Sequence, residues 1–191
     1  MFSMYLNLGI EHITDLNAYD HILFLTALAA VYLLKDWKKV LILVTAFTIG
    51  HTTTLALAIF KFINIPTNLI EFIIPVTIFI SSFFDFFYKE KVNDRKLHHI
   101  KYALAMFFGL IHGLGFSNYL RELLGNEENI LKPLFAFNLG LEIGQIIIVI
   151  CYLTLASVLV LIKVPRRDLT LIVAGAAFGI SIILMIERFP F

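Results

Sequence analysis

Apolar and polar positions alternate along this chain in long blocks rather than in the short periods of soluble helices or strands. Six apolar runs stand out, at about 15–34, 39–60, 68–88, 101–118, 132–162 and 169–187. Each approaches the ~20 residues that a helix needs to cross a bilayer. We therefore predict an all-α, polytopic membrane bundle of about six transmembrane helices, with seven as the alternative count, in a single domain over residues 1–191.

Whether the first run can span the membrane depends on where its helix begins, since its purely apolar part covers only Ile22 to Leu34. A helix that began near Thr14 or Asp15, either of which can act as an N-cap, would be long enough to span. Residues 1–14 then form an outer interfacial segment. This segment lacks the basic start and long apolar core of a cleavable signal peptide, so we expect none.

Composition agrees with an integral membrane protein. Hydrophobic residues make up 60% of the chain and charged residues only 15%, compared with roughly 25% charged residues in soluble domains. The mean hydropathy is +0.89. A net charge of +1 without a basic cluster argues against a nucleic-acid surface. The single cysteine, Cys151, excludes an internal disulfide.

The distribution of positive charge predicts which side of the membrane each connection faces. Eleven of the 15 Lys and Arg residues fall in the first, third and fifth connections, within 35–39, 89–101 and 163–167. Cytoplasmic loops carry such an excess. We therefore expect both termini on the periplasmic side of a bacterial inner membrane.

Three stretches carry two glycines four residues apart, namely GLIHG (109–113), GLEIG (140–144) and GAAFG (175–179). Small residues at this spacing let two helices approach closely in lipid. We expect these faces to pack inside the bundle, and they also offer a surface for oligomer formation.

Ionisable and amide side chains inside the runs gather at one depth. Counting about 1.5 Å per residue along each helix places a set of them in the outer half of the bundle: Asp20, His21, His51, Glu71, His112, Asn138, Glu142 and Gln145. The inner half offers only Asp85, which we expect to extend toward Lys89, with Ser81 one turn away and the loop histidines His98 and His99. A charge at the bilayer centre costs about 2.5–3.5 kcal/mol. Several ionisable residues at one depth therefore indicate a function that offsets this cost.

Histidines combined with carboxylates are a typical ligand set for a divalent transition metal, and nickel and zinc are the metals we favour. The predicted metal ligands are Asp20, His21, His51 and His112, with Glu142 or Glu71 as a further ligand or base and His12 as an additional ligand. Thr48, Thr52, Asn138 and Gln145 are candidates to hold the other ring nitrogens of the histidines. For any single residue the competing explanation is a hydrogen bond between helices.

Five stretches resemble, in sequence and in order, the HupE/UreJ membrane proteins, specifically the second HupE/UreJ-like group. They are YDHILFL (19–25), AFTIGHTTTLALA (46–58), IEFIIPVTI (70–78), FGLIHGLGFS (108–117) and FNLGLEIGQ (137–145). The resemblance implies a bacterial inner-membrane protein linked to hydrogenase or urease systems and regarded as a nickel permease or accessory protein. It places the characteristic polar positions at Asp20, His21, His51, Glu71, His112 and Glu142.

Two functions from different classes fit these residues. The first is a permease or accessory protein that captures nickel or another divalent metal and serves a metalloenzyme maturation system. The second is an intramembrane zinc-dependent hydrolase, in which Glu142 or Glu71 is the catalytic base acting on a lipid, lipoprotein or peptide at the outer leaflet. The one-sided distribution of polar residues favours the hydrolase, and the family resemblance favours the permease, which we prefer.

Overall fold

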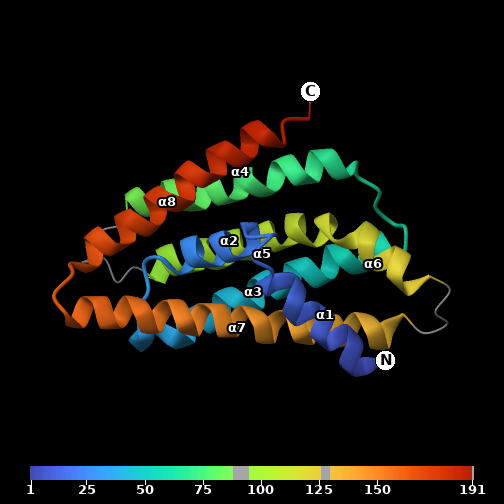
Figure 1. Ribbon diagram of the computed structural model, residues 1–191, viewed down its shortest axis with the longest axis horizontal. Coiled ribbons are helices and arrows are strands. Elements are labelled where there is room, and N and C mark those ends of the chain that lie inside the picture. Colours follow the sequence, from blue (N-terminus) through green and yellow to red (C-terminus); the bar gives the residue numbers. More distant parts are fainter. Residues whose placement is uncertain (88–94, 126–129, 191) are drawn as a thin grey trace.

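The computed structural model describes residues 1–87, 95–125 and 130–190, and this part of the chain is all-α, without a strand. Eight α-helices and one short 3₁₀ helix follow one another in it (Figure 1): α1 (Phe2–Thr14), α2 (Asp20–Ala29), η1 (Leu34–Asp36), α3 (Trp37–Ile59), α4 (Thr67–Phe86), α5 (Arg95–Gly115), α6 (Ser117–Leu124), α7 (Leu131–Leu161) and α8 (Arg166–Glu187).

Four helical segments in the described residues are long and apolar enough to cross a membrane, namely Leu34–Ile59, α4, α7 and α8. A fifth crossing results if His98–Gly115 and Ser117–Leu124, which are bent by 49° at a short break, are taken as one span. These segments match five of the predicted runs and agree with a multi-pass membrane protein. Lys89 and Lys91, which contributed to the predicted orientation, lie outside the described residues.

The predicted first span is wrong in its boundaries. α1 ends at Thr14 and α2 begins only at Asp20, so the apolar helix that follows has 10 residues and is too short to span alone. The Asp15 carboxylate accepts hydrogen bonds from the backbone N–H and the side-chain amide of Asn17, at 2.8 and 3.1 Å. Such local bonds offer the backbone an alternative to the helix. The count of six spans is therefore not reached by helix length.

Residues 1–14, predicted as an interfacial segment, form a helix that packs along the first half of α7. Gly9 faces the backbone of Phe137 and Leu141, and Gly140 faces the backbone of Leu6. A β-carbon at either glycine would collide with the neighbouring main chain. The GLEIG pattern therefore packs inside the bundle, as predicted. The two glycines of GAAFG do not, because nothing lies within 4 Å of a β-carbon placed at Gly175 or Gly179, although Ala177 between them is buried.

The arrangement of the helices places α2 in the interior of the bundle. It contacts α4 and α8 on one side and α7 on the other. Figure 1 shows α1 and α2 running in the same direction along the long axis, with α1 in the half where α7 begins and α2 in the other half. Both chain ends lie in the half that contains α1. The core around α2 is aromatic, with Phe24, Phe47 and Phe137 fully buried.

Candidate metal centre

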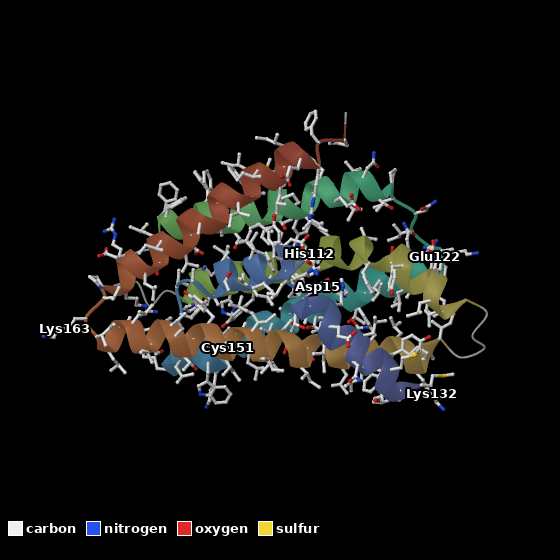
Figure 2. All side chains as sticks on the ribbon, in the orientation of Figure 1. Asp15, His112, Glu122, Lys132, Cys151 and Lys163 are labelled. Carbon is white, nitrogen blue, oxygen red and sulfur yellow. The ribbon has the colours of Figure 1, made fainter. Side chains whose placement is uncertain are left out.

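Four histidines from four different helices lie close together in the interior. His12 is near the end of α1, His21 is the second residue of α2, His51 lies within α3, and His112 lies near the end of α5. The ring centroids are 4.7 Å apart for His12 and His21, 5.4 Å for His21 and His112, and 6.4 Å for His12 and His51. Figure 2 shows His112 near the middle of the molecule. The structure thus gathers the four histidines that the sequence singles out.

Close packing of α3 against α5 determines where two of these rings lie. Gly113 faces the carbonyl oxygen of His51, and Gly109 faces the backbone of Phe47 and His51. A side chain at either position would meet the α3 main chain. Because the glycines stand on both sides of His112 in the sequence, the GLIHG pattern lets α5 carry this imidazole up to α3.

Most ring nitrogens of the histidine cluster (His12, His21, His51 and His112) have no hydrogen-bond partner. His21, His51 and His112 are only 6%, 0% and 1% exposed. Within the described residues the unpaired buried nitrogens are Nε2 of His12, both nitrogens of His21 and of His51, and Nδ1 of His112. The large majority of buried side-chain polar atoms in proteins have a hydrogen-bond partner. Nδ1 of His21 lies 3.1 Å from the Asp20 carboxylate, and the other five nitrogens, gathered in one place, fit a site for an ion that accepts lone pairs.

Phenylalanine rings surround the histidine cluster. The Phe116 centroid lies 3.9 Å from that of His12, and Phe24 and Phe47 lie 5.0 and 5.2 Å from His112. These rings offer no hydrogen bonds, so they leave the nitrogens without competing partners. A low local dielectric also strengthens any charge interaction inside the cluster.

Asp20 lies beside the histidine cluster and is held by a residue that sequence reasoning missed. Its Oδ2 accepts a hydrogen bond of 2.9 Å from Nη1 of Arg188. Its Oδ1 accepts one of 2.9 Å from the backbone N–H of His21 and lies 3.1 Å from Nδ1 of the same ring. Arg188 follows α8 near the end of the chain, where no periodic pattern marks it. The carboxylate predicted as a ligand is therefore paired with a guanidinium.

A second missed contact joins α4 to the histidine cluster. The hydroxyl of Thr77 lies 3.2 Å from Nε2 of His112, and both side chains are buried. Thr77 also donates to the carbonyl oxygen of Ile74 at 2.6 Å. Thr77 is therefore placed to hold a ring nitrogen, the role for which Thr48, Thr52, Asn138 and Gln145 are the candidates from sequence.

The polar residues predicted on α3 and α7 pair mainly with one another. The hydroxyls of Thr45, Thr48 and Thr52 donate to Glu142, Gln145 and Asn138 at 2.8, 2.9 and 2.6 Å. Asn138 also lies beside His51. Glu71 is exposed on α4. The described contacts therefore do not bring Glu142 or Glu71 to the imidazoles.

As the side chains stand, the described residues contain no group of three or more His, Cys, Asp or Glu placed to hold one metal ion. The histidine cluster is a set of closely spaced, unpaired rings rather than a completed coordination shell. Any ion would have to reorient them.

A pocket of about 650 Å³ reaches the histidine cluster from one side. It is lined by His12 and Glu11 of α1, by Asp15 and Asn17 of the break before α2, and by Tyr119 of α6, among others. Figure 2 shows Asp15 near the middle of the molecule. The interruption between α1 and α2 thus coincides with an opening beside His12.

Fold and site together define a multi-pass α-helical membrane protein with a buried cluster of histidines and one adjacent carboxylate. The chain matches the HupE / UreJ protein family over residues 1–188 and belongs to that family. This confirms the resemblance drawn from the five sequence stretches. Searches of curated proteins and of solved structures gave no match.

Proposed function

We propose that this protein binds a divalent transition metal, nickel or cobalt in the first place, as a permease or accessory protein of the bacterial inner membrane. The ligands are drawn from His12, His21, His51 and His112, with Asp20 supplying negative charge. The single observation that carries the proposal is the group of unpaired, buried imidazole nitrogens. Membership of the HupE/UreJ family, which is associated with nickel and cobalt transport or accessory function, supports the choice of metal.

The spacing of the rings suits a shared ion. Two imidazoles on one tetrahedral ion, with metal–nitrogen distances of roughly 2.0–2.1 Å, have ring centres about 5 Å apart. The centroid separations at His21 are 4.7 Å to His12 and 5.4 Å to His112. Rotation of the rings about their side-chain bonds, without movement of the helices, would therefore bring their nitrogens toward a common point.

The first membrane crossing, in this proposal, consists of α1 and α2 together. They run in the same direction and occupy successive halves of the bundle. Irregular backbone at membrane depth is tolerated where it lines a cavity, and broken helices often bind the ions of transporters. The break at residues 15–19 lies beside the pocket and between His12 and His21. Metal would reach the cluster through this pocket from the periplasmic side.

We do not extend the proposal to a zinc hydrolase. Glu142, its first candidate for the general base, is hydrogen-bonded to Thr45, and Glu71 is exposed on α4. A general base must lie within hydrogen-bond reach of the metal-bound water, directly or through one further water. Neither carboxylate is among the described contacts of the histidines.

The test is a metal titration of the full-length protein. Protein purified in detergent and stripped with a chelator is titrated with Ni²⁺, Co²⁺ and Zn²⁺ by calorimetry, and its folding is followed by size-exclusion chromatography. We expect one ion per chain, and at least tenfold weaker binding in His51→Gln and His112→Gln. His99→Gln, a change at an exposed histidine of α5, is the matched control.

Transport is measured separately, as uptake of the bound metal into proteoliposomes. Wild-type protein that binds none of the three ions would refute the proposal. So would His51→Gln and His112→Gln proteins that stay folded and bind as tightly as the control.

A further inference from the structure

A second buried polar group lies between α4 and α5, away from the histidine cluster. Nζ of Lys101 donates to Oδ1 of Asp85 at 2.7 Å, and the two residues are only 8% and 1% exposed. The expected partner of Asp85, Lys89, lies outside the described residues, and the partner that the structure describes is Lys101. Oδ2 of Asp85 is buried without a hydrogen-bond partner in the described part of the chain.

The ammonium group of Lys101 has a second favourable neighbour. It lies 5.6 Å from the centre of the Tyr32 ring, within the range of a cation–π interaction. The Tyr32 hydroxyl in turn lies 3.1 Å from Nδ1 of His98. His98, predicted to be a solvated loop residue, is thus part of α5 and of this inner group. Lys101 can therefore loosen its bond to Asp85 without losing all its partners.

A line of buried polar side chains connects this pair to the histidine cluster. Thr77, Ser81 and Asp85 follow one another at intervals of four residues on one face of α4, and they are 2%, 7% and 1% exposed. Thr77 contacts His112 at one end of this line, and Asp85 contacts Lys101 at the other. The rise of a helix puts Asp85 about 12 Å further along α4 than Thr77.

Stability does not explain why the pair is buried. Two charges removed from water recover little more than the cost of their desolvation, and apolar residues of similar size serve as well or better. Ionisable residues inside a membrane bundle commonly mark ion pathways. A conducting path also needs weaker ion-binding positions beyond its first site. In the inner half of the bundle, the sequence offers Asp85 for such a position.

We propose that Asp85 is a second cation-binding position on the metal pathway and that Lys101 is the built-in cation that occupies it at rest. A divalent ion leaving the histidine cluster passes Thr77 and Ser81 and binds the Asp85 carboxylate. The Lys101 ammonium then moves toward the Tyr32 ring and re-forms the ion pair after the ion has left. This inference rests on the proposed metal function and extends it to the inner half of the bundle.

The experiment compares metal flux with metal binding in a charge-neutral double variant, Asp85→Asn with Lys101→Met. Calorimetry with the ion that the wild-type protein binds reports the histidine cluster, and proteoliposome uptake reports the pathway. We expect unchanged binding and at least tenfold slower flux. The matched control, Asp36→Asn with Lys39→Met, removes a more exposed ion pair (3.4 Å) at the start of α3, where Asp36 also lies 3.4 Å from Arg166. We expect it to leave both readouts unchanged.

A conservative variant keeps the test decisive if the double variant does not fold. Lys101→Arg retains the positive charge and can hold both oxygens of Asp85 at once, so the pair is expected to open less readily. We expect at least fivefold slower flux with wild-type binding.

Each remaining outcome decides against one of the two proposals. Wild-type flux in a folded double variant or in Lys101→Arg would overturn the second cation position. The same holds for a folded double variant that no longer binds metal, and for wild-type protein that binds metal but shows no flux. Wild-type protein that binds no metal would instead overturn the proposed function.

Discussion

Arg188 pairs with the carboxylate of Asp20, which in the proposed function supplies negative charge to the metal ion, so removal of Arg188 should strengthen metal binding. The guanidinium holds Oδ2 of Asp20 at 2.9 Å. A metal ion bound to Oδ1 of Asp20 would lie roughly 6 Å from this guanidinium. The repulsion between a dication and a unit charge at that distance is about 1.4 kcal/mol in water and about 5.5 kcal/mol at an effective dielectric constant of 20. Because the Arg188 side chain is 29% exposed, we adopt the lower figure, which corresponds to about a tenfold change in affinity.

Arg188→Gln is therefore expected to bind Ni²⁺ or Co²⁺ about tenfold more tightly than the wild-type protein in a calorimetric titration. The metal-free variant should melt at a lower temperature, since a buried carboxylate loses its counter-charge, and metal should raise its melting temperature more than it does in the wild type. Arg167→Gln makes the same charge change at an exposed position and should do neither. Equal or weaker binding in Arg188→Gln would refute the reasoning, because Arg188 would then orient Asp20 rather than compete for it.

Two further predictions concern the helix contacts around the site. Gly140→Val places a side chain against the backbone of Leu6 and should cost about 1–3 kcal/mol of stability, measured as a lower melting temperature in detergent. The control Gly175→Val has open space around it and should leave the melting temperature unchanged. Equal melting temperatures of the two variants would contradict the α1–α7 packing. Glu142→Gln should lower stability by about 0.6 kcal/mol, the average for a hydrogen bond in a membrane protein, and should keep metal affinity within twofold. A tenfold loss in the same titration would restore Glu142 as a ligand.

The histidine cluster could be predicted because it depends on two quantities that can be read from the sequence. Long apolar runs define the helices, and the constant rise per residue gives each histidine a level within the membrane. His21, His51 and His112 were assigned to one layer in this way, and their rings lie within the same cluster. Residues at a common depth on different helices meet whenever their polar faces turn inward.

Contacts that depend on which face of a helix meets which neighbour could not be predicted from the sequence. Lys101 was counted as a loop charge, and its burial follows from Asp85 on another helix. GAAFG has the same spacing as GLEIG, but its two glycines face open space while Phe178 between them packs against Phe79 of α4, because spacing does not specify which residue meets the partner helix. The polar face Thr77, Ser81 and Asp85 could have been found, since its period of four residues is visible in the sequence.

The break between α1 and α2 gives the histidine cluster a property that a continuous helix would not provide. His12 is carried by α1, which is fixed to α7 through close glycine contacts. His21 and Asp20 are carried by α2, which also packs against α4 and α8. Because residues 15–19 are not helical, a small shift of α2 against α1 breaks no helical hydrogen bonds across the gap. An ion held by His12 and His21 together would connect these two parts, so metal binding and the relative position of α1 and α2 must influence each other.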